Sequence, residues 1–296
     1  MKNKLSTLKE LEEIEKKYDP QLSFREVGKK FNIIIFILLI TMSIYHFWAS
    51  GFGLVREVLH RGIHISYVIG LVFLLFSWKK NITTSTFLRI QNIPITDIIF
   101  SLLAVISALY LPLLPSEILA QRVGSPEKID VFMGSILIIL TLEATRRSVG
   151  FTLPLISIVF ILFAIFGPLA PGALKHGGTS WLGFVNHIYI TNQGVYGIAV
   201  GVMAQYVFLF ILFGVLATRV GLGKLFIDLA MLIAGKFSGG PAKVAIFSSA
   251  FMGTISGSSI ANTVTTGSLT IPAMKKVGYP SHFSGAVEAA SSTGGQ

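Results

Sequence analysis

The chain has 296 residues, of which 52% are hydrophobic and only 13% are charged, and its net charge is +10. A soluble domain carries about 25% charged residues, so this composition excludes an ordinary soluble protein and indicates a membrane protein. The basic residues stand at the ends of apolar runs, and no basic patch interleaved with aromatic residues predicts nucleic-acid binding. The absence of cysteine excludes disulfides, thiol catalysis and cysteine-ligated metals.

The first 30 residues are polar and charged, so we expect a soluble segment rather than a cleavable signal peptide. Within it, Leu5, Leu8, Leu11 and Ile14 recur at helical spacing and predict an amphipathic surface helix. Apolar runs long enough to cross a bilayer then follow. We predict six spans, at residues 31–49, 62–78, 94–114, 130–144, 151–169 and 194–218, with a short interfacial helix at 50–61.

Clusters of basic residues predict the orientation of these spans. Eight lysines and arginines precede the first span, and further basic residues follow the second, fourth and sixth spans. Loops rich in lysine and arginine stay on the cytoplasmic side. We therefore expect a multi-pass protein of the cell's inner (cytoplasmic) membrane, lying in the lipid bilayer with its N-terminus in the cytoplasm.

Several charged residues have a simple structural interpretation. Glu143 and Arg147 are four residues apart and predict a local ion pair on one helix. Asp97 follows a proline at a helix start, where a negative charge is favourable. His60 and His64 have a spacing that can bind zinc, but no third ligand stands nearby in the sequence. We expect these two histidines to be a solvated pair at the membrane interface.

A stretch rich in glycine, serine and threonine carries the main functional signal. It has two apolar arms, at residues 241–254 and 260–274, around a polar centre. Each arm is about 20 Å long as a helix, shorter than the roughly 30 Å hydrocarbon core. Lys243 flanks the first arm, and Lys275 and Lys276 flank the second. The pattern predicts a re-entrant helical hairpin, at about 241–277, that opens to the cytoplasm.

The tip of this hairpin offers neutral oxygen atoms. Gly257 permits a tight turn, and the serine hydroxyls and the Asn262 amide are ligands that Na⁺ accepts at a broken helix. The start of the second arm favours an anion such as a carboxylate. A packing interpretation stands beside this one, because Gly253 and Gly257 form a small-residue motif that brings membrane helices together.

The motifs SGSSIAN, TTG, TIPAMKKVGY and EAASSTGGQ, within residues 253–295, resemble the first hairpin region of the TRAP transporter large membrane subunit. The chain is similar in particular to the fused membrane proteins that serve TAXI-type binding proteins. In that arrangement a four-span small subunit precedes the large one. The resemblance implies a cytoplasmic segment at 1–30, a DctQ-like scaffold at 31–148 and the N-terminal part of a DctM-like transport domain at 149–296. It also implies that a second hairpin lies beyond a C-terminal truncation.

The resemblance implies sodium-coupled uptake of organic acids, such as carboxylates, delivered by an extracytoplasmic TAXI-type solute-binding protein. It places the Na⁺ candidates at the hairpin tip and a substrate region on the facing arm. The Na⁺ candidates are Ser256, Gly257, Ser258, Ser259 and Asn262, of which Ser258 and Asn262 are the strongest, and the substrate-region candidates are Thr265, Thr266 and Gly267. We expect no cofactor other than Na⁺ as coupling ion.

Two questions stay open at this point. Glu288 is either a functional carboxylate inside the membrane or an interface residue near a helix start. The chain itself is either a transporter component or a non-transporting scaffold or assembly subunit. An enzyme has no support, since the sequence contains no catalytic triad, phosphate-binding loop or acidic metal cluster.

Overall fold

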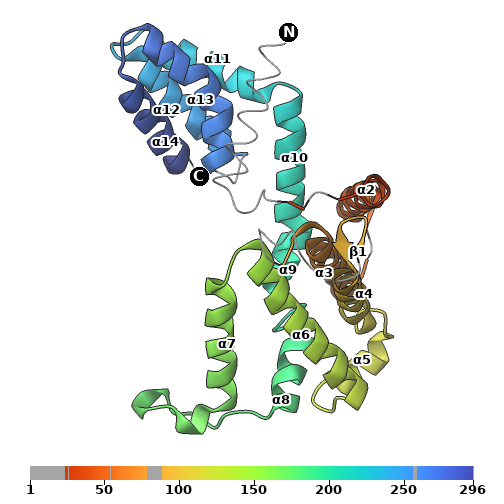
Figure 1. Ribbon diagram of the computed structural model, residues 1–296. Helices are drawn as coiled ribbons and strands as arrows, with labels where there is room; N and C mark the ends of the chain where they lie inside the picture. Colours follow the sequence, from red (N-terminus) through yellow and green to blue (C-terminus); the bar gives the residue numbers. More distant parts are fainter. Residues whose placement is uncertain (1–23, 26, 54, 79–88, 256–258, 296) are drawn as a thin grey trace. The chain divides into compact units, whose positions relative to one another are not determined.

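The computed structural model describes residues 24–295, apart from residues 26, 54, 79–88 and 256–258. These residues form two compact units, residues 24–206 and 207–295, and each is built almost entirely from helices (Figure 1). The predicted all-α class is therefore confirmed. The predicted surface helix near the N-terminus lies outside the described residues, and the predicted domain boundary at 148/149 stays a prediction.

Within the described part of the chain, three helical segments are long and apolar enough to cross a membrane: α2 (Lys29–Phe52), α3 (Glu57–Leu75) and Ile198–Arg219. The third segment joins α9 (Ile198–Val202), a π-helical turn (Met203–Val207) and α10 (Phe208–Arg219). These segments correspond to the first, second and sixth predicted spans.

The predicted interfacial helix at residues 50–61 was wrong. Its first residues continue α2 as far as Phe52, and its last residues form the start of α3 from Glu57 onward. The prediction ends each apolar run where polar residues begin. Helices continue past such points, because polar side chains at a helix end can reach water or bond to neighbouring segments.

The other predicted spans are also helices. α4 (Ile95–Tyr110) and α7 (Thr152–Ile165) are apolar but have only 16 and 14 residues, which gives lengths of about 24 and 21 Å. α6 (Lys128–Ser148) has 21 residues and carries charges at both ends. The connections contain α5 (Ser116–Arg122), 3₁₀ turns at Gly167–Leu169 and Gly172–Leu174, α8 (Trp181–Val185) and a π-helical turn (Asn186–Ile190).

A short β-hairpin precedes α4 and was not predicted. Strands β1 (Arg89–Ile90) and β2 (Ile93–Pro94) pair antiparallel around Gln91 and Asn92, whose φ angles are +50° and +72°. Two successive positive φ angles define the tight turn that suits a twisted two-residue hairpin. The Gln91 carbonyl accepts a hydrogen bond from the Gly28 amide at 3.0 Å, which attaches the segment before α2 to this hairpin.

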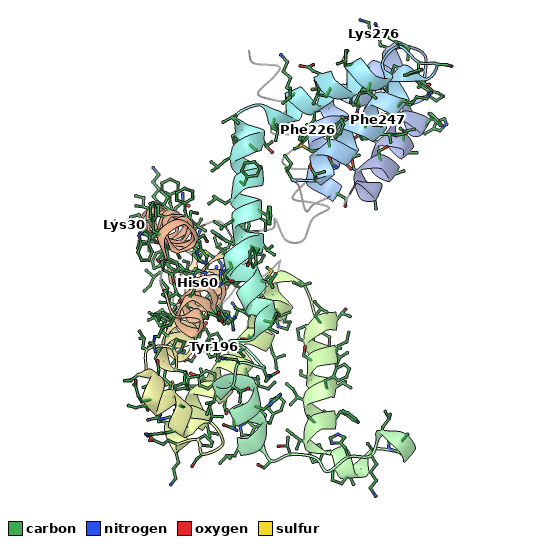
Figure 2. All side chains as sticks on the ribbon, turned by 180° about the vertical axis from the view of Figure 1, so that it is seen from behind. Lys30, His60, Tyr196, Phe226, Phe247 and Lys276 are labelled. Atoms are coloured by element: carbon green, nitrogen blue, oxygen red, sulfur yellow. The ribbon has the colours of Figure 1, made fainter. Side chains whose placement is uncertain are left out.

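The core of the first unit lies where α3, α4 and α6 meet. Phe73, Ala108 and Leu137 are fully or almost fully buried there. Two buried tyrosines attach the segment after α8 to α4. The Tyr189 hydroxyl donates to the Ser107 carbonyl at 2.6 Å. The Tyr196 hydroxyl donates to the Ala108 carbonyl at 2.8 Å (Tyr196 is labelled in Figure 2).

We expect Tyr189→Phe to lower the free energy of unfolding by about 1 kcal/mol, because the substitution removes a buried hydrogen bond and leaves the Ser107 carbonyl without its donor. Thermal unfolding of the purified protein in detergent measures the change. Tyr206→Phe is the matched control, since Tyr206 is exposed. Equal unfolding temperatures for the two variants would show that the bond contributes nothing.

Buried ion pairs join the segment before α2 to α4 and α6. Asp97 accepts hydrogen bonds from Arg25 at 2.5 Å and from Arg147 at 2.9 Å, and Arg147 also donates to Glu143 at 2.7 Å. The predicted pair of Glu143 and Arg147 is therefore confirmed. The interpretation of Asp97 as a simple helix-start charge was incomplete, because its carboxylate is buried between two arginines.

The two histidines of α3 are buried, so the prediction of a solvated pair was wrong. His64 Nδ1 lies 2.9 Å from Nε2 of His46 on α2, and the Tyr45 hydroxyl lies 3.0 Å from His60 Nδ1. α2 packs along α3 and covers the first turns of α3, which the sequence did not reveal. Among the described residues, no group of three or more histidine, cysteine or acidic residues could hold a metal ion.

Candidate ion and substrate site in the helical hairpin

The second unit contains the predicted hairpin. α12 (Gly240–Gly253) and α13 (Ser259–Lys276) are its two arms, and they pack against each other and against α14 (Ser281–Gly294) (Figure 1). α11 (Leu222–Ala234) lies along α12. The helical arms were thus placed to within two residues. That they enter and leave the membrane on one side stays a prediction.

Glycine and proline set the ends of these helices. Gly239 has a φ angle of +74° and precedes Gly240 and Pro241 at the start of α12. Gly239 is the N-cap of α12, where its positive φ is possible without strain because glycine has no Cβ atom. Proline is favourable in the first helical turn because it lacks an amide proton. Gly278, with a φ angle of +99°, ends α13, and Lys276 is exposed beside it (Figure 2). The breaker residues therefore act as the sequence predicted.

Asn262 lies in the first turns of α13 and is fully buried. Its Nδ2 donates to the Ser249 carbonyl on α12 at 3.0 Å. This bond fixes which end of the amide faces α12 and leaves Oδ1 as an acceptor, 3.5 Å from Thr266 Oγ1. An amide held in this way presents an oriented oxygen inside the unit.

Thr266 is also fully buried, one turn after Asn262. Its hydroxyl lies 2.8 Å from the Asn262 carbonyl and 3.2 Å from the Ser249 hydroxyl, and it contacts the Glu288 carboxylate. Gly267 is buried beside it, where a Cβ atom would lie 3.0 Å from Glu288 Cγ. Glycine at this position therefore allows α14 to approach α13.

The structure thus brings together three of the predicted site residues, Asn262, Thr266 and Gly267. Ser259 and Thr265 are partly buried on the same helix. The tip residues Ser256, Gly257 and Ser258 lie outside the described residues.

Glu288 of α14 is fully buried, so the alternative of an interface residue was wrong. Its Oε1 accepts from the Ser249 hydroxyl at 3.0 Å and from the Ser292 hydroxyl at 3.3 Å. Thr266 and Thr270 contact the same carboxylate through their hydroxyls. We call these five residues, from α12, α13 and α14, the hydroxyl–carboxylate cluster.

A sequence signal for this cluster existed. Ser284, Glu288 and Ser292 are spaced four residues apart, which places them on one face of a helix, and all three are fully buried. A face that carries only serine and glutamate inside an otherwise small and apolar segment indicates a polar contact with another helix rather than with lipid.

The packing interpretation of Gly253 also has support. A Cβ atom on Gly253 would lie 1.8 Å from the Gly295 carbonyl oxygen, so the last turn of α12 and the end of α14 are in direct backbone contact. The second glycine of that motif, Gly257, lies outside the described residues. Gly253 therefore serves helix packing next to the polar cluster, and the ion-site interpretation of the neighbouring residues stays a prediction.

The helices and the buried polar contacts define a multi-pass α-helical membrane protein. Residues 136–296, more than half of the chain, match the family described as "Tripartite ATP-independent periplasmic transporter, DctM component", and the chain belongs to this family. Its members are transporter permeases and not enzymes.

A curated relative, the "Putative TRAP transporter large permease protein" of Haemophilus influenzae (strain ATCC 51907 / DSM 11121 / KW20 / Rd), is 43% identical over 75 residues. The match covers 25% of this chain and 18% of the relative. No solved structure matches the chain.

Proposed function

We propose that the chain is the membrane permease component of a sodium-coupled TRAP secondary transporter for organic acids such as carboxylates. The observation that supports this most is the set of oriented, fully buried polar groups where α12, α13 and α14 meet in a DctM-family chain. Burying polar groups costs free energy unless they are hydrogen-bonded. Hydrogen bonds of this kind also hold membrane helices together, but a buried carboxylate and an oriented amide oxygen are groups that a transporter needs at its binding site.

Asn262 is the described residue best suited to bind Na⁺. Its Nδ2 is engaged by the Ser249 carbonyl, so its Oδ1 is available as a neutral oxygen donor. Further hydroxyl and carbonyl oxygens would come from Ser259 at the start of α13 and from Ser256, Gly257 and Ser258, which precede it in the sequence, as broken helices supply them in transporters. When bound, Na⁺ would neutralise part of the charge that an organic acid brings to the site.

The substrate carboxylate would lie near the start of α13, because the positive end of a helix dipole favours an anion. Thr265 is a candidate contact because it is partly buried. Thr266 and Gly267 face α14 instead, and they would shape the substrate region by fixing the distance between the helices.

In this proposal residues 31–148 form the DctQ-like scaffold, residues 149–296 belong to the DctM-like transport domain, and the N-terminus lies in the cytoplasm. The protein would reside in the inner membrane and receive its substrate from an extracytoplasmic TAXI-type solute-binding protein. The charged residues at the ends of the apolar helices, such as Arg146 and Arg219, support this orientation.

Substrate uptake tests the proposal. In proteoliposomes that contain the intact permease, with its binding protein added, we expect uptake to require a sodium gradient. Asn262→Ala and Ser258→Ala should each raise the Na⁺ concentration for half-maximal uptake about tenfold, which corresponds to the loss of roughly 1.4 kcal/mol. Ser268→Ala is the matched control, because Ser268 is exposed on α13. Uptake that ignores sodium and both substitutions would contradict the proposal and favour a scaffold or assembly subunit.

A further inference from the structure

Glu288 is a buried carboxylate without a neighbouring positive charge among the described residues. α14 packs against α12 and α13, and α11 packs against both of these helices. The charged and titratable side chains on these four helices, apart from Glu288 itself, are all exposed: Lys224, Asp228, Lys243, Lys275, Lys276 and His282. None of the ion pairs in the described parts of the chain includes Glu288.

An ionised carboxylate in such a place is costly. A buried charge is retained when it is paired or fully hydrogen-bonded, and it otherwise becomes neutral. The only described partners of Glu288 are the hydroxyls of Ser249, Thr266, Thr270 and Ser292. These hydroxyls are uncharged, so they cannot neutralise the carboxylate.

Counting protons in the cluster shows that it has two possible arrangements. A hydroxyl has one proton to donate but can also accept. Thr266 Oγ1 lies 2.8 Å from the Asn262 carbonyl, Thr270 Oγ1 lies 3.0 Å from the Thr266 carbonyl, and both hydroxyls also contact Glu288. Each threonine can therefore donate either to its backbone carbonyl or to the carboxylate, but not to both at once.

The two arrangements differ by one proton on Glu288. If the threonines donate to the carboxylate, Glu288 is ionised and the two carbonyls lose their side-chain donors. If the threonines donate to the carbonyls, Glu288 must supply the proton for one of the remaining contacts, with Thr270 Oγ1 as the acceptor for Oε2. Gain or loss of this proton, together with rotation of the hydroxyl groups, converts one arrangement into the other without moving a helix.

We propose that Glu288 is a proton-binding site: its carboxylate takes up one proton from water, keeps it, and donates a hydrogen bond through it to the Thr270 hydroxyl of α13. The proton returns to water when the hydroxyls turn toward the carboxylate. The site suits a proton because the side chains around Glu288 are packed too closely for a larger ligand. Ser249 Oγ lies 3.0 Å from Glu288 Oε1, and a Cβ atom on Gly267 would lie 3.0 Å from Glu288 Cγ. The role in uptake rests on the proposed function, but proton binding itself does not.

Infrared spectroscopy of the intact permease in lipid bilayers tests proton binding directly. We expect a carboxylic-acid C=O stretch that disappears as the pH rises, is missing in Glu288→Gln and is retained in Glu117→Gln. Glu117 is exposed on α5, so it is the matched control. Thr270→Val keeps the carboxyl group and should shift the frequency of the band. A band that titrates identically in Glu288→Gln would overturn the proposal.

Uptake by the intact permease with its binding protein tests the link to transport. At saturating sodium, uptake by the parent protein should fall up to about tenfold per pH unit on the alkaline side, as for one essential proton. Uptake by Glu288→Gln should be independent of pH in that range. Identical pH profiles of uptake for the parent protein and Glu288→Gln would overturn the proposal. A tenfold higher sodium requirement in Glu288→Gln would also overturn it, because that result would identify Glu288 as a sodium ligand. If uptake needs no sodium at all, the proposed function fails while the infrared result stands.

Discussion

Asp97→Asn should lower the free energy of unfolding by about 3–5 kcal/mol, the usual effect of removing one partner from a buried ion pair. Asp97 lies between Arg25 and Arg147, whose side chains are 8% and 0% exposed. Without the aspartate charge, Arg25 loses its carboxylate partner, and Glu143 is the carboxylate that remains for Arg147. Both arginines keep a longer hydrogen bond to the Phe76 carbonyl, at 3.2 Å from Arg25 and 3.4 Å from Arg147. The substitution preserves shape, so the effect isolates the charge.

Two buried guanidinium nitrogens make this site sensitive. Arg25 Nη1 and Arg147 Nη2 already lack a hydrogen-bond acceptor among the described residues. When Asp97 is neutralised, the Phe76 carbonyl is uncharged and cannot compensate the charge of Arg25, and an uncompensated buried cation is costly. Arg147 retains its contact with the face of Phe73, at 4.9 Å from the ring centre, which offsets part of the loss.

Chemical unfolding of the purified protein in detergent measures the effect, and Glu57→Gln is the matched control. Glu57 also pairs with an arginine, Arg61 at 2.8 Å, but its side chain is 69% exposed. An exposed pair of this kind contributes about 0.2–1 kcal/mol. If both variants lost equal stability, burial of Asp97 would not determine its contribution, and the account of this ion network would be wrong.

This network also shows what the sequence could and could not predict. The pair of Glu143 and Arg147 was predictable because its members are four residues apart on one helix. Asp97 and Arg25 are 72 residues apart. Periodicity describes which face of one helix is apolar, but it does not say which two helices meet, so a pair of this separation depends on tertiary packing that no local pattern contains.

The hairpin was likewise only partly predictable from the sequence. Gly239, Pro241 and Gly278 act through their own backbone angles, so the ends of its arms were predictable from local sequence. Asn262 was predicted because its amide is an oxygen donor near the polar centre of the hairpin, and Thr266 was predicted from the resemblance to the TRAP large subunit. Their contacts with Ser249 and Glu288 come from other helices and had to be seen in the structure.

Gly253→Ala is expected to be destabilising by about 1–3 kcal/mol or more, because a methyl group would be forced against backbone rather than against a flexible side chain. The added Cβ atom would lie 1.8 Å from the Gly295 oxygen and 2.4 Å from its carbonyl carbon. The contact is reciprocal, since a Cβ atom on Gly295 would lie 2.6 Å from the Ser249 oxygen. The end of α14 therefore has to move away from α12.

That movement should also disturb the hydroxyl–carboxylate cluster. Ser249 on α12 bonds to Glu288 on α14 and, through its carbonyl, to Asn262 on α13. Separating α12 from α14 lengthens the first bond and shifts the carbonyl that orients the Asn262 amide. We expect Gly253→Ala to reduce sodium-dependent uptake more than its loss of stability alone would, when both are measured on the same preparation below the unfolding temperature.

Gly285→Ala is the matched control for Gly253→Ala, because it changes the same residue type within α14 at a position with open space around it. Alanine is favoured over glycine in a helix by roughly 0.5–1 kcal/mol, so this variant should be slightly more stable than the parent. We expect Gly253→Ala to lower the unfolding temperature and Gly285→Ala to raise it, with uptake reduced only in Gly253→Ala. This result would show that close backbone approach, rather than helix propensity, requires glycine at position 253. If Gly253→Ala were as stable as Gly285→Ala, α12 and α14 could separate at no cost, and the cluster between them would not depend on their contact.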